Sequence, residues 1–245
     1  MKHRFLPCCL SIVLFVSVQG CAGLPTDRET IRGSGNISEA TYTFADITGV
    51  TLSTMGELEI QLGDTEELRI ETDDNLLQYF EAGMDGGVLT IGTSSRFSLR
   101  PSRTVNYTLS VKELEFIGLS STGNVHAPTL SADRFEIRMT STGDLSVDGI
   151  DTNGLDVRIS STGSVRIGGG VVDSQDIRIS STGDYDGQSL RSARATVRLS
   201  STGSARLWAE KSLDATLNST GSVYYKGDPE VADSQNSTGR VRRIR

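Results

Sequence analysis

The sequence is short of several residue types, and each shortage excludes a class of function. Only 6% of the 245 residues are aromatic, and 24 lysines and arginines stand against 31 aspartates and glutamates, for a formal charge of −7. A nucleic-acid-binding surface needs an excess of basic side chains to neutralise phosphates. Five prolines and 36% hydrophobic residues argue against wholesale disorder. The composition predicts a folded chain of one or two domains that does not bind nucleic acid.

Histidine and cysteine are also scarce. His3 and His126 are the only histidines, and the cysteines are Cys8, Cys9 and Cys21. One histidine beyond the N-terminal segment supplies neither a histidine metal centre nor a Ser/His/Asp triad. We therefore expect no cofactor, no metal site and no catalytic residues built on histidine.

Residues 1–20 have the pattern of a signal peptide. A basic start is followed by an apolar run from Phe5 to Val18, which is shorter than the ~20 residues of a membrane-spanning helix. The run ends in Val18-Gln19-Gly20-Cys21, which resembles a bacterial lipobox, where the peptidase cuts before a diacylated cysteine. The alternative is an ordinary secretory signal that is cut near Cys21 or Ala22.

Lipidation of Cys21 explains the remaining cysteine. Cys8 and Cys9 leave with the signal, so the exported chain has no partner for a disulfide. Two or three acyl chains make a stable anchor, at about 0.8 kcal/mol for each buried CH₂. Residues 21–36 are polar and form the lipidated tether. We predict a lipid-anchored protein of the bacterial cell envelope, in the outer membrane because alanine and not aspartate follows Cys21.

A repeated tripeptide is the strongest signal in the sequence. Ser-Thr-Gly occurs seven times, and its glycines are spaced by 20, 20, 20, 20, 18 and 18 residues. A catalytic motif is not copied in this way, whereas each coil of a solenoid must be, because it buries its apolar face only against its neighbours. The glycines are Gly123, Gly143, Gly163, Gly183, Gly203, Gly221 and Gly239.

The hydrophobic period within each unit is two, which is typical of a strand. Apolar residues recur six and four residues before the glycine and two residues after it, all with one parity. They therefore face inward, and stacking them at ~4.8 Å gives a continuous core. The first column holds Ile117, Ile137, Val157, Ile177, Val197 and Ala215; the second Leu119, Met139, Ile159, Ile179, Leu199 and Leu217; the third Val125, Leu145, Val165, Tyr185, Ala205 and Val223.

These columns predict an all-β chain, a single-stranded parallel β-helix with about 20 residues per coil. The usual preference for right-handed parallel crossovers predicts its hand. The domain spans residues 37–245, with irregular coils over 37–115 and regular coils over 116–245, about 29 Å long by the strand spacing. Glycine at each corner provides backbone angles that other residues avoid, and the serine and threonine hydroxyls satisfy turn groups and bond along the stack.

Charged residues form two outward columns, which we call the charged ladder. Four arginines lie five residues before their glycines, beside acidic residues two positions earlier. Stacked like charges repel unless they are paired, so the acids balance the arginines. A ligand-binding arginine row is the alternative. The ladder consists of Arg138, Arg158, Arg178 and Arg198 with Glu136, Asp156 and Asp176.

The chain resembles the family described as putative auto-transporter adhesin, head GIN domain, from about Phe44 to Lys226. The resemblance rests on Asp73-Asp74-Asn75-Leu76-Leu77, on the segment from Gly87 to Ile91 and on the serial Ser-Thr-Gly coils. It implies a right-handed β-helix of the pectin-lyase-like architecture. It implies no reaction.

An enzyme is the weakest of the alternatives. Asp144 and Asp184 occupy equivalent positions two coils apart, roughly 9.6 Å by the strand spacing, near the upper limit for an inverting glycosidase. Aspartate after glycine is also an ordinary turn residue, and the equal spacings leave no long loops to build a cleft. We therefore expect no catalytic activity.

Two further features lie near the C-terminus. Trp208, Tyr224 and Tyr225 either stack on sugar rings or pack and cap the last coils. The basic segment from Arg240 to Arg245 is expected to be a solvated terminus, with contact to anionic lipid or a partner as the alternative.

The sequence as a whole predicts a non-catalytic, adhesin-like lipoprotein that presents a repetitive face to an envelope glycan or protein. A structural or self-assembling envelope element is the alternative. The charged ladder is the candidate binding face, and the sequence does not specify the oligomeric state.

Overall fold

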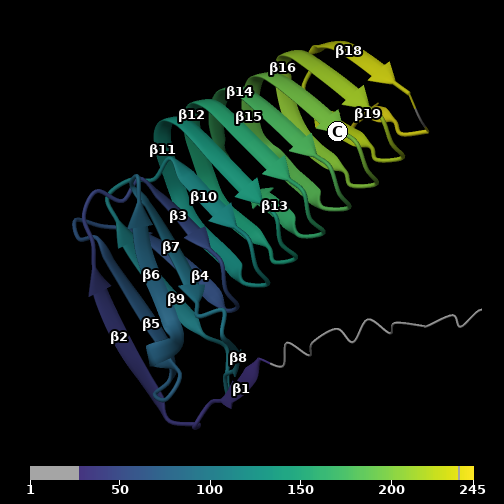
Figure 1. Cartoon of the computed structure of the whole chain (residues 1–245). Helices are drawn as coiled ribbons and strands as arrows, with labels where there is room; N and C mark the ends of the chain where they lie inside the picture. The colour runs from purple at the N-terminus through teal and green to yellow at the C-terminus, as the bar shows by residue number, and fades with distance from the viewer. Residues whose placement is uncertain (1–27, 237) are drawn as a thin grey trace, which may run out of the picture.

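The computed structural model describes residues 28–236 and 238–245, which form an elongated β-solenoid (Figure 1). This part of the chain contains no α-helix; its one helical turn is the 3-10 turn η1 (Leu77–Tyr79). The regular coils are built from β10 (Phe116–Leu119), β11 (Asn124–Met139), β12 (Leu145–Ile159), β13 (Ser164–Ile167), β14 (Gly170–Ile179), β15 (Asp184–Leu199), β16 (Ala205–Leu217), β17 (Val223–Lys226), β18 (Glu230–Gln235) and β19 (Val241–Arg243).

Consecutive coils pair in parallel with a register of 20 residues. Val125 lies opposite Leu145, which lies opposite Val165, and the same shift relates β10 to β11. The last coils pair at 18 residues, with Ala205 opposite Val223. The period of the Ser-Thr-Gly corners is thus the register of the sheet, as predicted.

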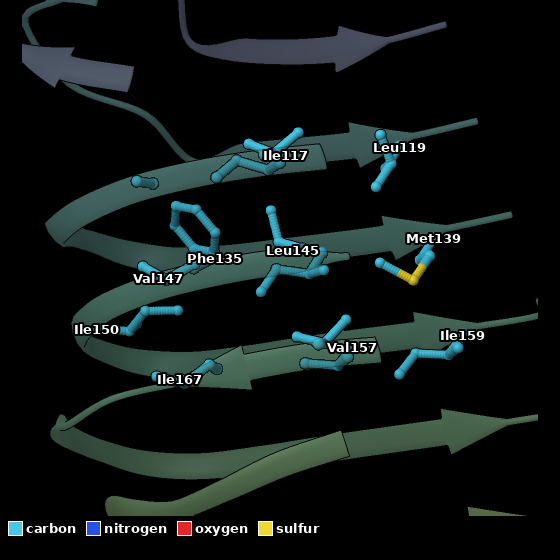
Figure 2. Packing of buried hydrophobic residues seen from close by; sticks show 14 of the residues in the cluster. Ile117, Leu119, Phe135, Met139, Leu145, Val147, Ile150, Val157, Ile159 and Ile167 are labelled. Atoms are coloured by element: carbon cyan, nitrogen blue, oxygen red, sulfur yellow. The ribbon is translucent and has the colours of Figure 1, made fainter. Parts of the chain in front are cut away.

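The three predicted apolar columns form the core. Their members are at most 2% exposed from Ile117 to Val223, and they stack along the inside of the coils (Figure 2). Each coil buries its apolar side chains against the coils before and after it, which is how a solenoid is stabilised. One polar group enters this core: the Tyr185 hydroxyl donates a hydrogen bond to Gln175 Oε1 over 2.9 Å, and burial raises the pKa of Tyr185.

The corner glycines are required for space and not for unusual backbone angles. None of the seven has a positive φ among the described glycines that do. A Cβ on Gly163 would lie 2.0 Å from the carbonyl oxygen of Gly143, and one on Gly203 would lie 2.1 Å from that of Gly183. The predicted reason for glycine was therefore wrong: adjacent corners approach too closely for any side chain.

The hydroxyls of the corners do not all behave as expected. The Ser141 and Ser161 hydroxyls are buried without a hydrogen-bond partner. Hydrogen bonds along the stack are formed instead by the residues that follow the glycines, where Ser164 donates its N–H and its hydroxyl to Asp144 Oδ1. The polar ladder thus lies one residue beyond the serines and threonines.

The N-terminal strands form a mixed sheet that covers one end of the solenoid (Figure 1). Pairing is parallel along β7–β3–β10 and along β9–β4–β11, which continues the regular coils. β2, β5 and β6 run antiparallel to their neighbours, so the irregular coils expected here are interrupted by hairpins. The strands are β1 (Glu29–Arg32), β2 (Ile37–Thr43), β3 (Gly49–Leu52), β4 (Glu57–Leu62), β5 (Glu67–Asp73), β6 (Phe80–Asp85), β7 (Val88–Thr93), β8 (Phe97–Arg100) and β9 (Asn106–Val111).

The C-terminal end of the solenoid is closed by polar side chains at inward positions. Asp233 and Gln235 follow Ala215 and Leu217 in the apolar columns, and both are exposed on β18. Gln235 donates a hydrogen bond to Asp233. Charged side chains that point inward on an end strand disfavour stacking of another chain.

Candidate functional site

The four arginines of the charged ladder lie directly opposite one another on β11, β12, β14 and β15. Arg138 pairs in register with Arg158, which pairs with Arg178, and Arg178 pairs with Arg198. The acidic residues stack beside them in the same way. The sequence therefore predicted both columns, and the parallel register brings all seven side chains to one face.

Each acid of the ladder bridges two arginines. Glu136 accepts hydrogen bonds from Arg138 over 2.7 Å and from Arg158 over 2.9 Å. Asp156 lies 3.0 Å from Arg158 and 3.4 Å from Arg178, and Asp176 bonds to Arg178 and lies 3.3 Å from Arg198.

The ion pairs leave a face that is almost neutral and still accessible. The arginine side chains are 40–51% exposed, so each pair contributes only ~0–1 kcal/mol to stability. Their remaining N–H groups and the carboxylate oxygens point to solvent as alternating donors and acceptors. Such a face suits hydrogen bonding to a polar ligand better than attraction of a polyanion.

A groove of about 740 Å³ lies at the N-terminal end of the ladder. The column of Arg138 continues to Gly118 and then to Thr51, and the column of Glu136 continues to Phe116 and Gly49. Long charged side chains thus give way to small residues on β10 and β3. The step between them forms the hollow, with Arg138, Arg158, Glu136 and Asp156 among its lining residues.

Phe116 gives the groove an aromatic surface. A Cβ on Gly118 would lie 3.0 Å from the tip of the Phe116 ring, so the ring extends over this glycine. The Arg138 guanidinium carbon lies 5.8 Å from the centre of the ring, a cation–π distance. We did not predict this residue. Its signal was its place in the acidic column, where a phenylalanine replaces the aspartate or glutamate of later coils.

Asp144 and Asp184 do not form a shared site. Asp144 Oδ1 accepts two hydrogen bonds from Ser164, and Asp184 Oδ1 accepts two from Ser204, at 2.6–3.0 Å. Asp144 borders a hollow of about 440 Å³ that Asp184 does not reach. Both carboxylates therefore tie one coil to the next, which accounts for them without catalysis.

His126 borders the same hollow and is half-buried. Its Nδ1 lies 3.0 Å from Ser146 Oγ, and its Nε2 lies 3.9 Å from Glu59 and 3.8 Å from Asp148. Within the described ranges, no group of three or more His, Cys, Asp or Glu side chains is arranged to hold a metal ion.

The predicted lipidation residue, Cys21, lies outside the described residues. From residue 28 onward, none of the described segments is a helix with the length and hydropathy needed to cross a bilayer.

Comparison with solved structures shows where this fold occurs. A putative adhesin from Bacteroides fragilis matches with a TM-score of 0.83 and 20% identity over 87% of this chain and all of its own. A putative lipid binding protein from Parabacteroides distasonis matches with a TM-score of 0.76 and 22% identity over 89% of this chain and all of its own. A putative adhesin from Parabacteroides merdae gives 0.72 and 19% over the same shares. No curated protein sequence matches the chain.

The family assignment rests on the sequence. The model of one family matches residues 46–229, three quarters of the chain, and includes every corner of the solenoid except Gly239. The chain therefore belongs to the family described as putative auto-transporter adhesin, head GIN domain.

Proposed function

We propose that the protein is a non-catalytic, adhesin-like component of the cell envelope that binds a neutral glycan through the charged ladder. The groove at the N-terminal end of the ladder carries this proposal, since it joins an aromatic ring to paired charged groups in one hollow.

The chemistry of the groove fits a sugar. The face of an aromatic ring packs against the C–H groups of a sugar ring, as Phe116 is placed to do. Sugar hydroxyls both donate and accept hydrogen bonds, which matches the guanidinium and carboxylate groups along one wall. Because each arginine already faces an acid, a polyanion would gain little net attraction here.

A self-assembling structural element is less well supported. Stacking of copies end to end requires an open apolar edge. Asp233 and Gln235 place polar groups at the C-terminal edge, and β2 and β6 run antiparallel at the other end.

The Arg138→Ala/Arg158→Ala variant tests the groove. We expect it to lose about tenfold or more in affinity on a glycan array that includes neutral envelope polysaccharides, because two charge-assisted donors are removed from the wall. Circular dichroism and thermal unfolding should be almost unchanged, since both side chains are exposed.

The Arg178→Ala/Arg198→Ala variant is the matched control. It removes the same charge from the same ladder, outside the lining of the groove. Equal losses in both variants would place binding on the whole ladder and not in the groove. Absence of binding by the unmodified protein to any neutral glycan would contradict the proposal.

We further propose that Cys21 carries the lipid anchor of an outer-membrane lipoprotein. The lipobox-like sequence before it supports this assignment. Cys21→Ser should abolish metabolic labelling with palmitate and move the protein from the membrane fraction to the soluble fraction, because about 0.8 kcal/mol is lost for each acyl CH₂. Labelling that survives the substitution would contradict lipidation at Cys21.

A further inference from the structure

The C-terminal basic segment is part of the fold. β19 pairs with β17, which places Arg242 opposite Tyr224 and Arg243 opposite Tyr225. The N–H of Ile244 donates to the carbonyl oxygen of Tyr225 over 2.8 Å. The expectation of a solvated terminus was therefore wrong, and the aromatic and basic features of the sequence meet on one face.

Trp208 lies next to this strand pair. Trp208 stands opposite Lys226 in the register of β16 and β17, and it lines a hollow of about 560 Å³. Lys226, Arg243 and Arg245 are among the other lining residues, and this volume falls within the ~300–1,000 Å³ of small-ligand sites. We call this hollow, with its side chains, the distal basic site.

The aromatic rings are held in place by cations on the same coils. The Arg191 guanidinium carbon lies 5.1 Å from the centre of the Trp208 ring, and Arg191 is fixed by an ion pair with Glu210. Arg206 lies in the same way 5.3 Å from the centre of the Tyr224 ring. These contacts immobilise the rings before any ligand arrives, which lowers the entropic cost of binding.

The charge of the distal basic site is not balanced, in contrast to the charged ladder. Arg243 pairs with Asp228 at 3.0 Å. Among the described residues, no carboxylate lies within 4.0 Å of the charged nitrogens of Lys226, Arg242 or Arg245. An acidic protein thus carries a local excess of positive charge at one end, which attracts anions.

From these observations we infer that the distal basic site binds an acidic glycan, through a hexose unit that carries a carboxylate. The Trp208 ring provides the surface for the sugar ring, and Lys226 and Arg245 provide donors for the carboxylate. The site lies at the end of the solenoid opposite the N-terminal sheet, and it is separate from the groove (Figure 1).

A membrane surface fits the distal basic site less well. Proteins that enter a lipid interface use exposed apolar side chains beside their basic residues. The large hydrophobic side chains that the described chain exposes are Tyr42, Leu62, Met84 and Val171, and none belongs to the last coils. Trp208 is half-buried in the wall of the hollow and does not protrude.

Binding of charged and neutral forms of one sugar tests the inference. Residues 22–245, which contain every described strand, are titrated by calorimetry with oligogalacturonate and oligoglucuronate, each beside its methyl ester. We expect the charged forms to bind and the esters to bind about tenfold or more weakly, with affinity falling as salt rises. Equal binding of acid and ester, or no binding of either acid, would overturn the inference.

Two variants locate the site. Lys226→Ala/Arg245→Ala should weaken binding of the uronates about tenfold or more, and Trp208→Leu should weaken binding of acid and ester alike. Arg178→Ala/Arg198→Ala removes the same charge from the ladder and should bind normally. Equal losses in the two arginine- or lysine-deficient variants would indicate attraction by net charge alone and would overturn the site.

Two further arms separate this inference from other outcomes. Vesicles of phosphatidylglycerol that bind as tightly as the uronates would favour a lipid surface and overturn a glycan site. The Arg138→Ala/Arg158→Ala variant should keep its affinity for the uronates, so failure of the groove proposal and failure of the distal basic site give different results.

Discussion

Replacing Gly163 by alanine is expected to lower the free energy of unfolding by about 3 kcal/mol or more, at or above the usual upper range for overpacking. The new Cβ would lie 2.0 Å from the carbonyl oxygen of Gly143 and 3.0 Å from the sulfur of Met139. Parallel hydrogen bonds hold neighbouring coils at ~4.8 Å, so the carbonyl cannot retreat without separating two coils. Denaturation in urea, followed by circular dichroism, measures the change.

Gly83→Ala is the matched control for this substitution. Gly83 lies on β6, its φ is not positive, and no atom lies within 4 Å of the position of its Cβ. Its replacement should change the free energy of unfolding by no more than about 1 kcal/mol. If the two variants were equally stable, close approach of the corners would not be the reason for glycine there.

The regular coils were predictable because two periods coincide in them. The alternation of apolar residues identifies strands, and the 20-residue repeat places equivalent residues in register. Ile137, Val157 and Ile177 illustrate both, since the positions aligned by counting are the positions that stack and are fully buried. The same alignment brought the ladder arginines together.

Direction of pairing was not predictable for the N-terminal strands. Alternation of buried and exposed residues in β5 is the same whether its neighbours run parallel or antiparallel. The groove depends on that topology, because Thr51 of β3 joins it only through pairing with β10. Similarly, β19 is three residues long and mostly charged, which hides a strand from any pattern of hydrophobicity.

Asp73→Asn is expected to destabilise the N-terminal sheet by about 2–4 kcal/mol, the cost of leaving buried donors without an ionised acceptor. Asp73 is 0% exposed, at the end of β5. Its Oδ1 accepts hydrogen bonds from the N–H of Gly35 and the hydroxyl of Ser102, and its Oδ2 accepts one from the N–H of Ser102. Either orientation of an asparagine amide would turn its NH₂ group toward a backbone N–H. Urea denaturation at neutral pH measures the loss.

Asp74→Asn is the control for this prediction. Asp74 is exposed, and its carboxylate accepts hydrogen bonds from the Ser34 hydroxyl and from the N–H of Asn75. An amide oxygen can still accept these bonds at the surface, so the cost should stay below about 1 kcal/mol. Equal losses at both positions would show that the burial of Asp73 is not what makes its carboxylate important.

The pH dependence of stability separates the charge of Asp73 from its shape. Burial on its own would raise the pKa of Asp73, but the hydrogen bonds from Ser102 and Gly35 outweigh it and lower this pKa. The pKa of Glu66 is lowered as well, by the N–H of Ile47 first, against the effect of burial, and then by the N–H of Asp46 and by Lys112.

A group whose pKa is lowered on folding stabilises the protein above its unfolded pKa, near 4 for these carboxyls, and the stabilisation is lost as the pH falls through the folded pKa. The unmodified protein should therefore lose stability below about pH 4. Asp73→Asn should lose less over that range, and Asp73→Asn combined with Glu66→Gln should lose least. Thermal unfolding from pH 7 to pH 2 measures these slopes; an acid response as steep in the double variant as in the unmodified protein would assign the loss to other carboxylates.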